Sequence, residues 1–129
     1  MIYKVKTDTK IEKLKEELEE KAKKFGFGIL KSYAFQDILE GKGFPIEKDI
    51  TVYELCNPAG AQKVLSQIVE ISVYLPCRLS VYEENGQTVL ATIGFENILE
   101  SVEVDEDFKL FMSELFKHLK ALMNSWNKG

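Results

Sequence analysis

The sequence is short of the residues on which most metal centres and many catalytic centres depend. It contains one histidine, His118, two cysteines, Cys56 and Cys77, and a single arginine, Arg78. Two cysteines are too few for a structural zinc site, and neither a CxxC motif nor paired histidines supply the missing ligands. Any imidazole-based acid–base catalysis would have to use His118, which no partner motif accompanies. We therefore expect no metal and no cofactor, and the sequence favours a protein that is not an enzyme.

The sequence also lacks the segments that direct a chain to a membrane or to nucleic acid. No apolar run approaches the roughly 18 residues of a membrane-spanning helix, and residues 1–5 show no secretory signal. The net charge is −4 and there is no basic cluster, so neither nucleic acid nor an anionic membrane surface should attract the chain. Two cysteines do not make a disulfide framework. We expect a cytoplasmic protein without nucleic-acid or membrane partners.

The residues that are present predict one α+β domain over residues 1–129. With 45% hydrophobic and 29% charged residues, the composition is that of an ordinary globular domain. Hydrophobic periodicity predicts the following order, in which the two long helices should lie on one face of an antiparallel sheet. Strands are expected over 2–6, 27–34, 50–56, 77–83 and 87–95, long helices over 10–25 and 105–126, one helical turn over 35–40, and a short helix after the third strand.

Four short sequence signals set the expected ends of these elements. Residues 7–9, Thr-Asp-Thr, offer side-chain oxygens that could cap the first helix, and Gly26 should end it. Asn57 followed by Pro58 is typical of a helix start. Asn85-Gly86 is a strong signal for a two-residue hairpin between the last two strands.

A candidate site follows from one predicted strand pairing. If the strand that ends at Cys56 pairs with the strand that begins at Cys77, then Cys56, Asn57, Cys77 and Arg78 meet at one end of the sheet. The first turn of a helix and a guanidinium both suit an anion, so we predict that these four residues bind a ligand. The same field would lower the pKa of a cysteine and raise its reactivity.

Each of these residues also has a purely structural interpretation. Free cysteine is often buried as a small hydrophobe. Asn57 could simply cap its helix, and the role of Pro76 could be limited to shaping the backbone before a strand. Arg78 could cover the sheet with its stem and pair with a nearby carboxylate. His118 falls at the edge of the apolar stripe of the last helix, where we expect a partly solvated side chain.

The face of the predicted hairpin that points away from the core is unusually apolar. Strand alternation places Leu79, Val81 and Leu90 on the core side. The opposite face then carries Arg78, Ser80, Tyr82, Val89, Ala91 and Ile93. A second copy of the chain, a ligand or loops of the same chain could cover this face, and a symmetric dimer is favoured.

Three segments of the chain resemble a known family. They are Gly-Phe-Gly-Ile-Leu at 26–30, Glu-Leu-Cys-Asn-Pro at 54–58 followed by Ala61, and Leu-Pro-Cys-Arg at 75–78 leading into Val-Tyr-Glu at 81–83. They are similar to the family catalogued as domain of unknown function 302, specifically over about 33–97 and more loosely in the flanking helices. The positions that match its motifs are Cys56, Asn57, Pro58, Pro76, Cys77 and Arg78. Residues 94–96, Gly-Phe-Glu, depart from it where many members place a proline.

The resemblance implies a fold but no activity. Members are mostly bacterial and archaeal, often dimeric, with a strand–helix–four strands–helix layout like that of the TATA-binding-protein-like group. Because the net charge of this chain is negative, we expect no DNA binding despite the name of that group. No activity is established for the family, so no catalytic residue is carried over.

Three functions remain open from the sequence. The first is a homodimer that binds a small anionic or apolar ligand near Cys77 and Arg78, with Asn57 assisting. The second is thiol chemistry, in which Cys56 or Cys77 carries sulfur or senses redox state. The third is a dimerisation module without a ligand, whose apolar sheet face serves only assembly.

Overall fold

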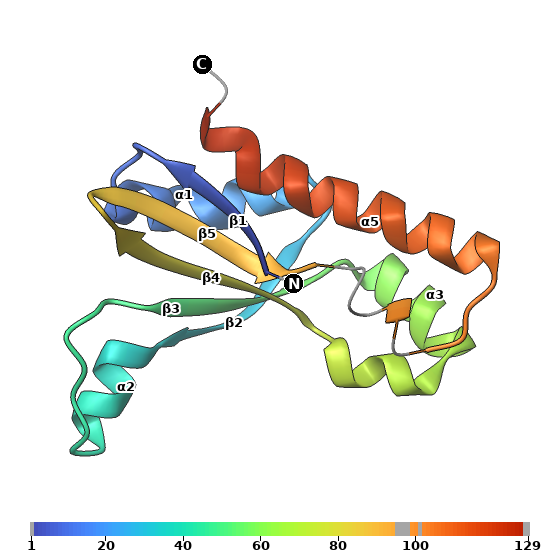
Figure 1. Cartoon of the computed structure of the whole chain (residues 1–129), viewed down its shortest axis with the longest axis horizontal. Coiled ribbons are helices and arrows are strands. Elements are labelled where there is room, and N and C mark those ends of the chain that lie inside the picture. Colours follow the sequence, from blue (N-terminus) through green and yellow to red (C-terminus); the bar gives the residue numbers. More distant parts are fainter. Residues whose placement is uncertain (1, 95–98, 101, 128–129) are drawn as a thin grey trace.

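The computed structural model describes residues 2–94, 99–100 and 102–127. Strands and helices alternate as far as Gln67, after which a second helical segment and a two-stranded hairpin precede the last long helix (Figure 1). The elements are β1 (Ile2–Thr7), α1 (Ile11–Lys24), β2 (Gly28–Ala34), α2 (Phe35–Gly41), β3 (Thr51–Cys56), α3 (Pro58–Gln67), the 3₁₀ helix η1 (Val69–Tyr74), β4 (Cys77–Glu84), β5 (Gln87–Ile93), α5 (Glu106–Asn124) and the 3₁₀ helix η2 (Ser125–Asn127). Within the described ranges, no helix has both the length and the apolar character needed to cross a membrane.

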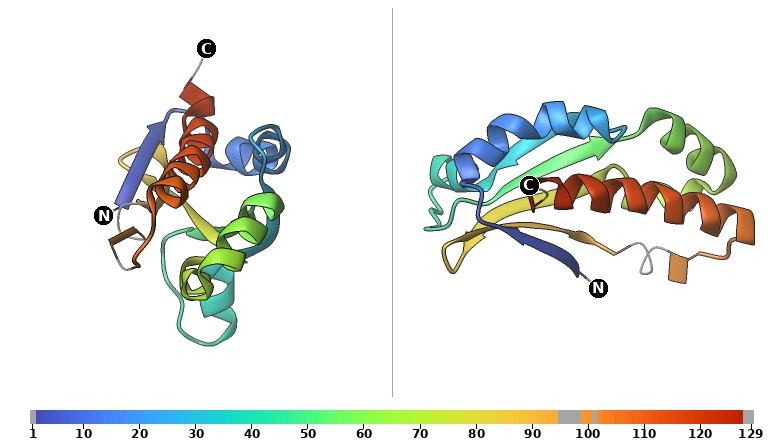
Figure 2. Two further views of the ribbon diagram at one scale, coloured as in Figure 1. Left: turned by 90° about the vertical axis from the view of Figure 1, so that its right-hand side faces the viewer. Right: turned by 90° about the horizontal axis from the view of Figure 1, so that it is seen from above.

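The five strands form one antiparallel sheet in the order β1-β5-β4-β3-β2. Helices α1 and α5 lie side by side over one face of this twisted sheet (Figure 2). The predicted α+β class, with an antiparallel sheet and both long helices on one face, is confirmed. Helix α3 and η1 gather beyond the end of the sheet where β3 ends and β4 begins, whereas α2 lies at the opposite end (Figure 1).

Two apolar clusters hold these layers together. The larger cluster joins α1 and α5 to the sheet through buried side chains such as Leu14, Leu18, Leu79, Leu90 and Leu122. The smaller cluster joins α3 and η1 to the first half of α5 and is built on Val64, Ile71, Phe108 and Met112. The hydrophobic periodicity that predicts the first helix corresponds to its buried face, which carries Ile11, Leu14, Leu18 and Ala22.

Most of the predicted element ends are confirmed, and one is wrong. Asn57 caps α3, and its Oδ1 accepts a hydrogen bond from the backbone N–H of Gly60 at 2.8 Å. Gly26 has φ +90° and follows Phe25, the C-cap residue of α1, while Asn85 and Gly86 turn the β4–β5 hairpin with φ 53° and 79°. These positive φ values are the reason that glycine or asparagine stands at each position.

The start of α1 is not capped by the predicted threonines. The helix begins at Ile11, and Lys10 occupies the capping position without a side-chain hydrogen bond. The Thr7 hydroxyl instead accepts from the backbone N–H of Thr9 at 3.3 Å and contacts the Thr9 hydroxyl at 3.2 Å. The two hydroxyl groups therefore close a local turn before the helix, which is the competing use of threonine near a helix start. The predicted end of the last strand at Phe95 lies outside the described residues.

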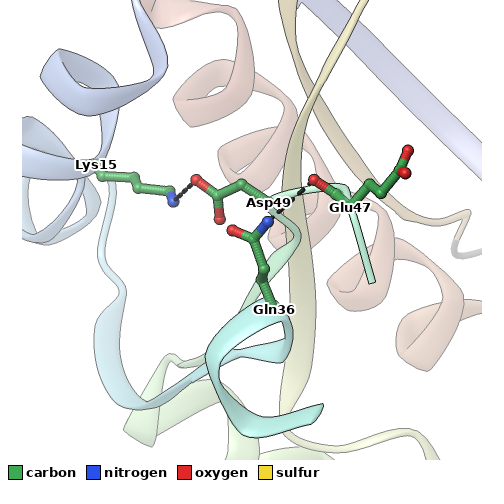
Figure 3. Close-up of polar contacts among 4 residues, drawn as sticks. All are labelled: Lys15, Gln36, Glu47 and Asp49. Atoms are coloured by element: carbon green, nitrogen blue, oxygen red, sulfur yellow. Dashed lines mark hydrogen bonds and ion pairs between the residues drawn. The ribbon is translucent and has the colours of Figure 1, made fainter. Parts of the chain in front are cut away.

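The segment between α2 and β3 is tied back to two helices (Figure 3). The ammonium of Lys15 on α1 lies 2.9 Å from a carboxylate oxygen of Asp49. The side-chain amide of Gln36 on α2 donates to the backbone carbonyl of Glu47 at 3.0 Å. These contacts fix the entry to β3 and so help to set the register of the strand that carries Glu54 and Cys56.

Candidate functional site

The strand pairing on which the candidate site depends is confirmed. Strands β3 and β4 run antiparallel, with Leu55 opposite Cys77 and Glu54 opposite Arg78. Cys56 ends β3 and Asn57 follows it, while Cys77 and Arg78 begin β4. The segments 56–58 and 76–78, distant in the chain, are therefore neighbours at the end of the sheet that faces α3 and η1.

A cavity of about 530 Å³ opens at this end, between the sheet, η1 and α5. Its size falls within the range of small-molecule sites. Its lining is mainly apolar, and Arg78 is the single charged side chain among the described residues that form it. The lining residues are Ile2, Phe27, Val52, Val73, Tyr74, Leu75, Pro76, Cys77, Arg78, Ser80, Ala91, Thr92, Ile93, Met112, Leu115, Phe116 and Leu119.

A second cavity of about 310 Å³ adjoins the first beneath α3. Cys77, Leu75 and Leu115 contribute to both cavities, so the two share a wall. Cys56 and Asn57 line only the smaller one, whereas Arg78 lines only the larger. The four predicted site residues are thus near one another, but they divide between two adjoining hollows.

Arg78 is held at the edge of the larger cavity by an ion pair. Its side chain is 68% exposed, and its Nη2 lies 3.7 Å from Oε2 of Glu54, whose side chain is only 14% exposed. The Tyr33 hydroxyl donates to the other oxygen of Glu54 at 3.2 Å. The carboxylate of Glu54 is therefore fixed on both sides, while most of the guanidinium of Arg78 faces solvent. Arg78 thus pairs with a nearby carboxylate, as its structural interpretation predicts, and still has N–H groups that Glu54 does not engage.

Asn57 links two parts of the backbone. Besides capping α3, its Nδ2 donates to the backbone carbonyl of Gly26 at 3.0 Å. The helix start is thereby fixed to the turn that follows α1. The structural interpretation of Asn57 fits these contacts, and the structure does not bring its side chain into the cavity that Arg78 lines.

The surroundings of Cys77 favour a neutral thiol. Burial raises the pKa of Cys77, and the nearby Cys56 raises that pKa further. This direction is opposite to the lowering that a reactive thiolate requires. Cys77 shares a face with Leu55, its partner in the ladder, and alternation directs Cys56, the next residue along β3, to the other face. Both cysteines are free and partly buried.

The remaining candidate residues lie apart from the cavities. His118 is exposed on α5 and contributes to neither lining. Among the residues that the structure describes, no three His, Cys, Asp or Glu side chains gather closely enough to hold a metal ion. Among the described residues, this end of the sheet therefore offers apolar surface, the guanidinium of Arg78 paired with the carboxylate of Glu54, and two thiols.

Comparison with known proteins places the chain in a family. The model of the family described as "Domain of unknown function DUF302" matches residues 3–126. The chain belongs to this family. A solved structure described as an uncharacterized conserved protein DUF302 from Bacillus stearothermophilus is similar to it, with 30% identity, a TM-score of 0.86 and coverage of 95% of each chain. No curated protein matches the chain.

Sequence reasoning missed part of the site of this DUF302 protein. Glu54 and Tyr33 were not recognised as partners of Arg78, although Glu54 stands in the same motif as Cys56. The signal was available, because opposite charges on neighbouring antiparallel strands commonly pair once the register is known. The contribution of η1, which supplies Val73 and Tyr74 to the larger cavity, was also missed. No periodicity in residues 69–74 indicated that helix.

Proposed function

We propose that this protein binds a small apolar or anionic molecule in the larger cavity, at the end of the sheet that carries Cys77 and Arg78. The observation that carries the proposal is a cavity of about 530 Å³ with a mainly apolar lining and one charged group at its edge. Binding sites for small molecules commonly have this character, in which apolar walls provide affinity and a few polar groups orient the ligand. Arg78 is the group that would hold an anion.

We further propose that the protein acts as a homodimer whose two copies meet through the sheet face opposite α1 and α5, here called the open face. Ile2 and Ile93 lie opposite each other on this face and are 65% and 46% exposed. Tyr82 and Val52 lie on the same face and are half-buried. Ile2 and Ile93 also line the larger cavity, so a second copy over the open face would help to close it.

Two other functions are less well supported. Thiol-based sulfur transfer or redox sensing needs an accessible thiolate, and burial shifts the pKa of Cys77 in the wrong direction. A dimerisation module without a ligand needs no hollow, yet a cavity lies at the Cys77 end. Both observations favour a binding function over these alternatives.

The proposal is tested by fluorescence titration with N-phenyl-1-naphthylamine, a neutral apolar probe that becomes fluorescent in apolar surroundings. We expect saturable binding of one probe per chain. Octanoate should displace the probe, and Arg78→Lys should weaken octanoate binding about tenfold because a planar fork is replaced by a point charge. Native mass spectrometry of protein purified from its own source should reveal a copurifying small molecule. A titration that never saturates would contradict the proposal.

A further inference from the structure

We infer that Glu54 makes the binding site selective for apolar molecules that carry a single negative charge, such as a carboxylate, over those that carry two. This inference rests on the proposed function and specifies the class of ligand. Glu54, on β3, does not itself line the cavity. It pairs with Arg78, which does, and so lowers the positive electrostatic potential at the cavity edge. The basis of the inference is the row of side chains that crosses β2, β3 and β4 on the open face.

The row consists of Lys31, Glu54 and Arg78, which lie in register on three neighbouring strands. Glu54 is in the middle and pairs with Arg78 at 3.7 Å. The ammonium of Lys31 instead lies 4.9 Å from the centre of the Tyr33 ring, and Lys31 is absent from the described lining of the cavity. Among the described residues, the positive charge at the cavity edge is therefore that of Arg78.

The carboxylate of Glu54 partly offsets the positive potential of Arg78 without cancelling it. This carboxylate is largely shielded from water and accepts a hydrogen bond from the hydroxyl of Tyr33, and both features restrain it beside Arg78. One guanidinium nitrogen is engaged by Glu54, and the remaining N–H groups of Arg78 stay available to a ligand. A monoanion would meet one guanidinium with a carboxylate beside it. For a dianion, the attraction of Arg78 and the repulsion of Glu54 both double, so a potential that Glu54 partly cancels gives it little advantage. Its desolvation in an apolar cavity costs more than that of a monoanion, and the described lining offers no second cation to offset that cost.

The ligand chemistry follows from joining this polar edge to the apolar cavity. The apolar part of the ligand would occupy the space beneath α5, and its single anionic group would lie against the free N–H groups of Arg78. A phosphate monoester would be disfavoured in comparison with a carboxylate on the same apolar tail. Glu54 is thus a specificity-determining residue that acts through Arg78.

The test uses three ligands that each contain a straight chain of eight carbons: octanol, octanoate and octyl phosphate. Isothermal titration calorimetry at mildly alkaline pH, where octyl phosphate is mostly a dianion, gives their affinities. The wild-type protein should bind octanoate more tightly than octyl phosphate. Glu54→Gln keeps the shape and the hydrogen bond to Tyr33 but removes the charge. It should tighten octyl phosphate binding by about threefold or more, tighten octanoate binding less, and leave octanol binding unchanged.

Glu84→Gln is the matched control, because Glu84 also pairs with a cation, Lys6 at 3.8 Å, but lies at the other end of β4. It should alter none of the three affinities. If octanol and both anions fail to bind, the proposed function itself fails. Two results would overturn the role of Glu54 while leaving the proposed binding function intact. Either octyl phosphate binds as tightly as octanoate, or Glu54→Gln does not change the ratio of their affinities. Unchanged octanol binding also shows that the variant is folded.

Discussion

The side-chain amide of Asn57 donates a 3.0 Å hydrogen bond to the backbone carbonyl of Gly26. Gly26 has φ +90°, and a Cβ built there would lie 3.1 Å from the Asn57 amide nitrogen. The two residues belong to separate motif segments of the chain, and this contact explains why they occur together. The turn after α1 needs a glycine both for its backbone conformation and for the close approach of Asn57.

Asn57→Ala should destabilise the fold more than it weakens ligand binding. Loss of the helix cap costs about 1 kcal/mol, and loss of the hydrogen bond to Gly26 costs about another 1 kcal/mol. Urea unfolding should therefore show a decrease of about 2 kcal/mol. Asn57→Asp keeps the capping oxygen and should recover part of the loss. A folded Asn57→Ala variant that no longer binds octanoate would instead make Asn57 a ligand-binding residue.

Leu115→Trp should block the larger cavity. Leu115 lines both cavities from α5, so an indole at this position would extend into the hollow. We expect the affinity for N-phenyl-1-naphthylamine to fall by at least about tenfold, or about 1.4 kcal/mol. Leu110→Trp is the matched control, since Leu110 lies on the same helix, is 65% exposed and lines neither cavity. Equal affinities in two folded variants would place the probe elsewhere.

The thiol of Cys77 should be slow to react in the folded protein. Burial raises the pKa of Cys77, and Cys56 adds to this. In a Cys56→Ser variant, the pH midpoint of iodoacetamide alkylation should therefore lie above that of the same chain unfolded in urea, which is about 8.5. A midpoint below the unfolded value would revive the thiol hypothesis.

The raised pKa of Cys77 also makes the free energy of unfolding depend on pH. The folded chain holds the Cys77 proton more tightly than the unfolded chain does, so this stabilisation is full below the unfolded pKa and is lost as pH rises through the folded pKa. Relative to Cys77→Ala, the free energy of unfolding of the wild type should fall between neutral and strongly alkaline pH. Tyr53, whose pKa is also raised by burial, is present in both proteins and cancels in the difference.

Tyr82→Glu should separate the two copies of the proposed dimer. Tyr82 lies on the open face but does not line the cavity, and a carboxylate there would be buried without a partner if a second copy packed on this face. Light scattering during size exclusion should show twice the chain mass for the wild type and one chain mass for the variant. Leu110→Glu, on α5, should remain dimeric. A wild-type protein that is monomeric at all concentrations would rule out the dimer.

The sequence predicted the fold better than it predicted the site, for physical reasons. Periods of two and of three to four residues identify strands and amphipathic helices directly, and Asn57, Gly26 and Asn85-Gly86 act through local hydrogen bonds and backbone angles. The side-chain cap of α1 was mispredicted because the Thr7 and Thr9 hydroxyls bond within a turn rather than to the helix. A threonine hydroxyl near a helix start can either cap the helix or bond within a preceding turn, and the short sequence pattern does not distinguish the two.

The neighbourhood of Cys56 and Cys77 could be predicted from one strand pairing, but its details depend on register. Only the register places Glu54 against Arg78 and sends Cys56 and Cys77 to different faces. The cavities could not be predicted at all, because they depend on how far α5, α3 and η1 stand from the end of the sheet. No sequence pattern encodes a space that side chains leave unfilled.

The most direct test of the proposed function is to map octanoate onto the protein by amide chemical-shift changes in ¹H–¹⁵N spectra. We expect the saturable changes to concentrate at the edge and walls of the larger cavity, in particular at Cys77, Arg78, Thr92 and Leu115, and to be much smaller at the exposed Phe44 and Val69. Changes that centre on Phe44 or Val69, or that spread evenly without saturating, would contradict a ligand site at this end of the sheet.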